Sequence, residues 1–162
     1  MPYMIVTSCM FISATTRFMT STGQPDGAVT IWDAAEPHAP TALHTLRAGG
    51  DDVSTGAGAV SPDGTLAAMG TAGGRLLVWR VDGEEPRQVV DVEGGPDALP
   101  FVLFTADSEA VLAFGRAGSV RLVDLSGGEE GEVVDETVLG GALFSAGIRS
   151  DGLLATSDDG DG

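Results

Sequence analysis

The sequence predicts an all-β protein, and three observations carry that prediction. The 162 residues include 24 glycines and eight prolines, a density of chain-breaking residues that leaves little room for long helices. The apolar stretches are short and end at turn-forming residues, as β-strands do. Two sequence markers then recur along the chain at a shared spacing, which indicates a structural unit repeated several times.

The first marker is an aspartate placed just before a short apolar stretch. Asp63, Asp107 and Asp151 follow one another at intervals of 44 residues (63 to 107, 107 to 151). The second marker is a glycine followed by an apolar run, and its copies start 47 and 44 residues apart at Gly27, Gly74 and Gly118. Because the two markers keep nearly the same spacing, they define one repeating unit.

Each unit is expected to contain a tight turn between short strands. In residues 61–64, Ser-Pro-Asp-Gly, the proline sets φ for a turn and the glycine accepts positive φ. Residues 65–69 form an apolar run that ends at Gly70, which favours a strand over a helix. Residues 70–74 predict a glycine-rich turn into a second strand at 76–79, which is apolar on both faces. A sheet of about four such strands must stack between similar sheets.

At this point the chain resembles the WD40 repeat family of β-propellers. The likeness rests on residues 61–67 and on 27–33, which end in Trp32-Asp33, with weaker copies at 76–80 and 120–124. The resemblance implies blades of four antiparallel strands, and seven blades in most relatives. It covers residues 14–162 and leaves 1–13 as a poorly matched N-terminal segment.

The repeat units are expected at about 14–50, 51–94, 95–138 and a truncated 139–162, roughly three and a half in all. Since propellers close with about four to eight blades, this number predicts an incomplete ring. Three interpretations remain open: the chain is a fragment of a longer gene product, two copies complete one ring, or a half-ring persists with exposed edge strands. The sequence favours the first, a fragment of a larger bacterial WD40-repeat protein, because it stops in the middle of a repeat unit.

The chain also departs from the family pattern. Ala48-Gly49 stands where the family often has Gly-His, and Gly73 stands where a turn aspartate is common. The resemblance implies a hydrogen-bonded tetrad formed by that His, a Ser or Thr, the Trp and the turn Asp. Because the second unit lacks this His and this Asp, the tetrad is not expected there. Trp79 is followed by Arg80 rather than Asp. We therefore expect the blades to depend on packing more than on polar networks.

Charge and cysteine content limit the possible partners and compartments. The formal net charge is −16 and all eight basic residues are arginine, so nucleic-acid binding is not expected. The single Cys9 forms no internal disulfide, and residues 1–13 have neither the positive start of a secretory leader nor the length of a membrane span. A lipoprotein-type cleavage box at 6–9 is a weaker alternative. We expect a cytoplasmic protein that does not engage membranes.

No residue is predicted to be catalytic, cofactor-binding or metal-binding. Residues 56–61 resemble a nucleotide loop only faintly, because a proline turn follows instead of a helix. Residues 70–75 lack the ending of a P-loop, and residues 129–132 are expected to be a solvated acidic loop. Three sets of side chains could in principle act as ligands or nucleophiles, but their spacing favours no site: the acidic tail Asp158, Asp159 and Asp161, the histidines His38 and His44 in a proline-containing connection, and Cys9.

The sequence therefore favours a non-catalytic protein–protein interaction or scaffold module. The chain also resembles bacterial repeats from GC-rich genomes, and this resemblance implies an alternative function. The chain would then be a detached sensor propeller of an NTPase- or kinase-linked signalling enzyme whose catalytic domain lies outside this chain. A third possibility is a degraded gene whose product has no role. The expected partner is a protein of unknown identity, with self-association as a further option.

Overall fold

The computed structural model describes residues 6–12, 15–23, 27–49, 52, 54–93, 98–127, 132–138, 143–148 and 154–158. All regular structure in these residues is β, as the sequence predicts. The strands form three four-stranded antiparallel sheets and one two-stranded sheet, in chain order. Each sheet is built from consecutive strands, so every connection within a sheet is a local turn or loop.

The first sheet has the order β1-β2-β3-β4. Its strands are β1 (Val6–Phe11), β2 (Arg17–Thr22), β3 (Ala28–Asp33) and β4 (Thr41–Arg47). The strand β1 comes from the segment that the sequence leaves outside the repeats, and it pairs along β2 from Val6 to Phe11.

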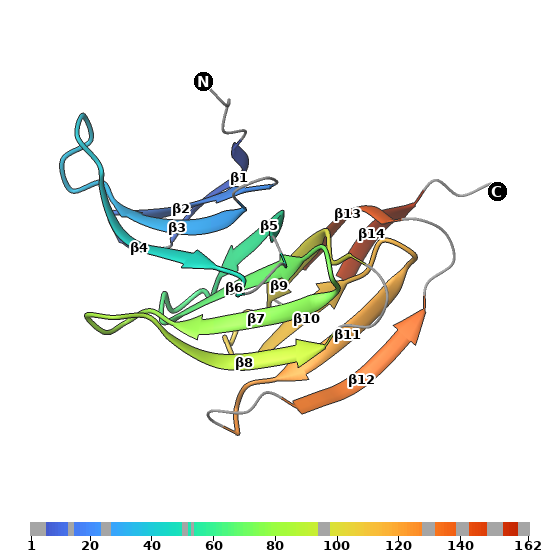
Figure 1. The fold of residues 1–162 in the computed structure, drawn as a ribbon. Coiled ribbons are helices and arrows are strands. Elements are labelled where there is room, and N and C mark those ends of the chain that lie inside the picture. Colours follow the sequence, from blue (N-terminus) through green and yellow to red (C-terminus); the bar gives the residue numbers. More distant parts are fainter. Residues whose placement is uncertain are drawn as a thin grey trace.

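The second and third sheets repeat this order and connectivity. The strands of the second are β5 (Ser54–Val60), β6 (Leu66–Thr71), β7 (Arg75–Arg80) and β8 (Arg87–Glu93). Those of the third are β9 (Phe101–Phe104), β10 (Ala110–Phe114), β11 (Ser119–Asp124) and β12 (Glu132–Val138). A two-stranded sheet of β13 (Leu143–Ile148) and β14 (Leu154–Asp158) follows. In Figure 1 the fourth strands β4, β8 and β12 form the outer edges of the three successive sheets.

A β-bulge recurs at one position of all three four-stranded sheets. The register of the third strand against the fourth shifts after Ile31, after Val78 and after Leu122. These positions are 47 and 44 residues apart, the same intervals that separate the marker glycines. Because a bulge bends and twists its strand, its recurrence gives the three outer strands a similar course.

Two apolar clusters hold the sheets against one another. Strand β7 contributes to both clusters through its alternating side chains. Leu77 and Trp79 pack in a cluster with residues of the first sheet. Leu76 and Val78, on the other face, pack in a cluster with residues of the third sheet. The middle sheet is therefore buried on both faces, as its apolar strand predicts. A third cluster, around Phe114, lies on the far face of the third sheet.

Glycine allows close approach at both sheet boundaries. A Cβ on Gly58 would lie 2.8 Å from Cγ2 of Val29 in the first sheet, and one on Gly70 would overlap the carbonyl oxygen of Leu99, just before β9. The sequence predicted that Gly70 ends its strand, but β6 continues through Gly70 to Thr71. Position 70 requires glycine because the backbone of Leu99, in the segment that leads to the third sheet, lies against it and leaves no room for a side chain.

The predicted turn at residues 61–64 is present and is copied 44 residues later. Ser61 donates to the carboxylate of Asp63 over 2.6 Å, and Thr105 donates to Asp107 over the same distance. Each hydroxyl also accepts the N–H that starts the next strand, at 2.9 Å for Ser61 and 3.0 Å for Thr105. Gly64 has φ of 75°, the left-handed conformation that the sequence required there.

Two loop predictions are corrected by the structure. Glu132 was expected in a solvated loop, but it begins β12, where its partner is Asp124. His44 was expected in a connection, but it lies within β4 opposite Ile31. Both strands are outer strands with mostly polar, exposed residues, so they lack the apolar alternation by which strands are recognised. The rest of that predicted loop, residues 129–131, lies outside the described part of the chain.

Candidate interaction surface

The side chains that could act as ligands or nucleophiles do not assemble into a site in the described part of the chain. Cys9 is exposed on β1, His38 lies in the exposed loop after β3, and Asp158 ends β14. Asp159 and Asp161 fall outside the described residues. Among those that are described, no three His, Cys, Asp or Glu residues stand together as a metal would require.

The two glycine-containing segments that were compared with phosphate loops are sheet elements. Residues 56–60 belong to β5, and residues 70–75 cover the end of β6, a turn and the start of β7. The N–H of Gly73 in that turn is already occupied, since it donates to the carboxylate of Asp52 over 2.9 Å. Neither segment leads into a helix whose N-terminus could face a phosphate.

Arg75 joins the second sheet's turn to its outer strand. Its guanidinium donates to both carboxylate oxygens of Asp91, through Nε at 3.1 Å and Nη2 at 2.5 Å, and its Nη1 lies 3.9 Å from Asp52. The hydrogen bond with Asp91 raises the pKa of Arg75 above its usual value. Sequence reasoning predicted dependence on packing, and it missed this polar group because Asp52 comes from the segment before the sheet.

The turn aspartates are structural carboxylates. Hydrogen bonds from the Thr105 hydroxyl and the Glu109 N–H hold the pKa of Asp107 below its usual value. At Asp63, burial acts to raise the pKa. Hydrogen bonds donated by Ser61 and Thr65 outweigh burial, so the pKa of Asp63 is also below its usual value. A carboxylate stabilised in its charged form and committed to its own turn is a poor general acid or base at neutral pH.

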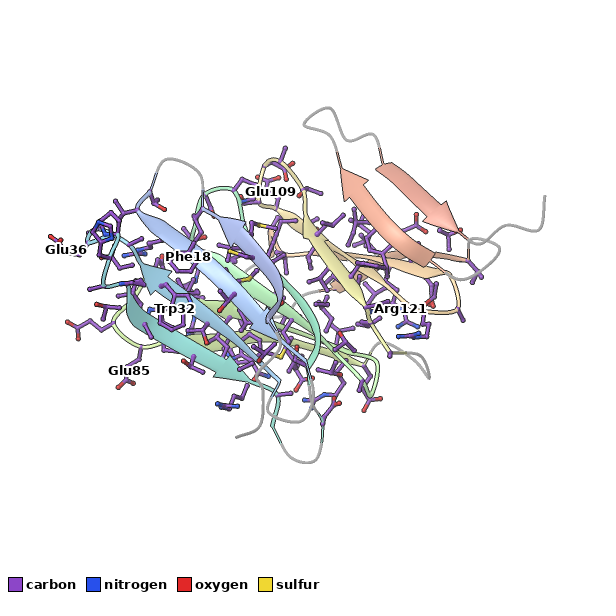
Figure 2. The ribbon with its side chains drawn as sticks, turned by 90° about the horizontal axis from the view of Figure 1, so that it is seen from above. Phe18, Trp32, Glu36, Glu85, Glu109 and Arg121 are labelled. Carbon is purple, nitrogen blue, oxygen red and sulfur yellow. The ribbon has the colours of Figure 1, made fainter. Side chains whose placement is uncertain are left out.

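The first sheet has a face without acidic residues, turned away from the second sheet, and its one arginine is Arg47, which lies opposite Ala28. Val29 and Ile31 pack toward the second sheet, so the alternation of β3 places Trp32 on the opposite face. There Trp32 stacks on Phe18, with ring centroids 6.0 Å apart and planes 8° from parallel, and Figure 2 shows the two rings on the opposite side of the molecule from Arg121. The indole N–H donates to the hydroxyl of Thr20 over 2.9 Å.

The outer strand of the third sheet is a second open surface. All seven residues of β12 are exposed, whereas β4 and β8 each have buried members. Three of its residues are apolar and strongly exposed: Val133 at 38%, Val134 at 50% and Val138 at 71%. Glu132, Asp135 and Glu136 add three carboxylates to the same strand, which has no basic residue.

One ion pair ties this strand to its neighbour. Arg121 of β11 donates to Glu136 over 2.8 Å, and its side chain is 14% exposed. The other two carboxylates, of Glu132 and Asp135, pair with no basic side chain among the residues that the structure describes. The negative charge of β12 is therefore only partly compensated.

No protein-family model matches the chain, and no curated protein matches it. The described residues contain no helix with the length and apolarity needed to cross a membrane. The class that the structure defines is that of stacked four-stranded antiparallel sheets with two open surfaces.

Proposed function

We propose that this chain is a non-catalytic protein-interaction module whose sheets are blades of the WD40 type. The observation that carries the proposal is the recurrence of one sheet, with its turn hydrogen bonds and its outer-strand bulge, at the intervals of the sequence markers. Repeats of this kind present edges and loops to other macromolecules while their cores serve only stability.

One hydrogen bond gives specific support for the WD40 assignment. Trp32 precedes Asp33 at the end of β3, and its indole N–H reaches Thr20 on β2, the Trp-to-Ser/Thr link that the resemblance implies. In the second sheet Trp79 lies opposite Ala67, and Met69 occupies the place of Thr20, so that sheet has no matching acceptor. Among the described residues, this one link of the tetrad is present in the first sheet, and apolar packing takes its place in the second.

The face of the first sheet without acidic residues supports self-association as part of this proposal. Its equivalent on the second sheet, which includes Leu77 and Trp79, is covered by the first sheet. We propose that a second copy covers the face bearing Phe18 and Trp32 in the same way, since the acidic charge of the chain is absent from it. Light scattering tests this idea: a dimer that Trp32→Asp converts to monomer supports it, and a wild-type monomer at high concentration contradicts it.

The function itself is tested by a pair of assays on the purified chain. The immobilised chain is expected to retain a protein from the native extract in a saturable manner, with reciprocal retention when that protein is immobilised instead. In parallel, a panel of hydrolase and phosphotransferase substrates is expected to show no turnover. Turnover that scales with protein concentration and disappears on unfolding would overturn the proposal.

A further inference from the structure

We propose that β12 is a docking strand for a basic extended peptide, which adds to the third sheet as a further strand. This inference rests on the proposed interaction function and names the surface and the chemistry of the partner. The strand is the last of its sheet, so one of its backbone edges pairs with no described strand. Extended peptides bind such edges through main-chain hydrogen bonds, and their alternate side chains provide specificity.

The edge is only partly protected against pairing with another chain. Natural edges are blunted by charged side chains, lysine above all, by proline, by bulges or by a covering element, and β12 carries three acidic residues. β12 contains neither lysine nor proline, and none of its residues is covered. It does have a bulge at Val134, but the same bulge occurs in β4 and β8 and so belongs to the repeat. Three exposed valines on an edge that no described strand covers, beside carboxylates that would attract a basic partner, indicate a surface that another chain covers.

The pairing register separates the side chains of β12 into two kinds of face. Val133, Glu136 and Val138 lie opposite Val123, Arg121 and Ser119, so they share the face of β11 that carries Arg121. Glu132, Asp135 and Thr137 lie opposite Asp124, Leu122 and Val120 and occupy the other face. One face therefore offers two valines flanking a neutralised ion pair, and the other offers two uncompensated carboxylates.

This division specifies the peptide. An added strand places its own alternate residues beside each face, because side chains directly opposite in neighbouring strands are in contact. Apolar residues fit beside Val133 and Val138, and lysine or arginine fits beside Glu132 and Asp135. The matching sequence alternates basic and β-branched residues over about seven positions. The net charge of −16 adds attraction for such a peptide and opposes a second copy at the same edge.

The binding test uses a fluorescently labelled seven-residue peptide of alternating lysine and valine and the full chain. Fluorescence anisotropy is expected to show saturable binding that weakens with salt. A block peptide, with its lysines together and its valines together, is expected to bind at least fivefold more weakly. Equal binding of the two peptides would mean attraction by charge alone and would overturn the proposal, as would no binding of the alternating peptide.

Charge reversal on the strand identifies the surface. Glu132→Lys combined with Asp135→Lys is expected to raise the dissociation constant at least fivefold. Glu84→Lys combined with Glu85→Lys makes the same change in net charge in the exposed loop before β8, and it is expected to have less than a twofold effect. All four positions are exposed, so circular dichroism should match the wild type. Equal losses in the two double variants would contradict docking at β12.

Backbone pairing is tested in the peptide, which leaves the protein intact. Only one edge of an added strand faces β12, and that edge uses the N–H groups of alternate residues. N-methylation of the valine amides and of the lysine amides should therefore have unequal effects, with one peptide losing at least tenfold in affinity and the other staying within threefold. Equal effects would overturn strand addition.

Two further outcomes separate this proposal from its alternatives. A wild-type dimer that the β12 double variant disrupts would overturn the proposal by assigning the edge to a second copy. If the extract yields a saturable protein partner while the alternating peptide does not bind, the docking strand is wrong and the proposed interaction function stands.

Discussion

The backbone N–H of Asp63 donates a hydrogen bond to the hydroxyl of Ser108 over 3.3 Å. This bond joins the turn before β6 to the equivalent turn before β10, so successive sheets are linked at their turns as well as through their cores. Gly64 and Ser108 occupy the same place, 44 residues apart, and both have positive φ, at 75° and 65°. A Cβ on Gly64 would come within 3.2 Å of Ile12, which directly follows β1. The turn before β6 is therefore close to the first sheet as well as to the turn before β10.

The first prediction concerns Ser108, the only non-glycine residue with positive φ in the described chain. Ser108→Gly removes the steric cost of the left-handed conformation but also removes the acceptor, whereas Ser108→Ala keeps the cost and removes the acceptor. We expect the glycine variant to exceed the alanine variant in unfolding free energy by about 1 kcal/mol. Urea unfolding followed by tryptophan fluorescence measures both. Equal stabilities would contradict the backbone conformation at this turn.

The second prediction concerns the close approach at Gly70. Gly70→Ala places a Cβ against the carbonyl oxygen of Leu99, and backbone on both sides restricts relief of the overlap. We expect a loss of roughly 1–3 kcal/mol in unfolding free energy, the usual cost of overpacking. The matched control is Gly127→Ala, where a Cβ meets open space. A Gly70→Ala variant as stable as this control would show that the sheets are not packed as described.

The third prediction concerns the bond between Trp32 and Thr20. Thr20→Val removes the acceptor at nearly constant volume and leaves the indole N–H without it, so the unfolding free energy should fall by about 1 kcal/mol. Combined with Trp32→Phe, a double-mutant cycle should give a coupling of about 0.5–1.5 kcal/mol. Thr41→Val, on the exposed part of β4, serves as the control. Strict additivity of the two substitutions would rule out the bond.

The fourth prediction concerns acid stability. The pKa values of Asp63 and Asp107 are lowered in the folded chain from an ordinary value of 3.8. Their contribution is therefore complete above that value and is lost as the pH falls through the lower folded pKa values. The variant with both Asp63→Asn and Asp107→Asn should be less stable at pH 7 and should lose less stability between pH 5 and pH 2. Urea midpoints across this range check both, and parallel curves for variant and wild type would be the contrary result.

The sequence predicts the sheets where the signal is local. Residues 61–64 encode their turn directly, and the run at 76–79 shows by its composition that β7 is buried on both faces. It could not predict that Asp52 would occupy the N–H of Gly73, because the two meet only when the chain folds back across 21 residues. It also missed β12 as an open surface, since seven residues that are all exposed carry no pattern of burial.

The central claim is that one four-stranded sheet is repeated three times. The most direct test of this claim is whether the bulge occurs at the same position in all three sheets. Nuclear Overhauser contacts between strands report which residues lie opposite one another. The account predicts that Trp32 faces Ala42, Trp79 faces Gln88 and Val123 faces Val133, with Leu43, Val89 and Val134 each omitted from the pairing. Uninterrupted register through these three residues, or pairing between strands of different sheets, would contradict it.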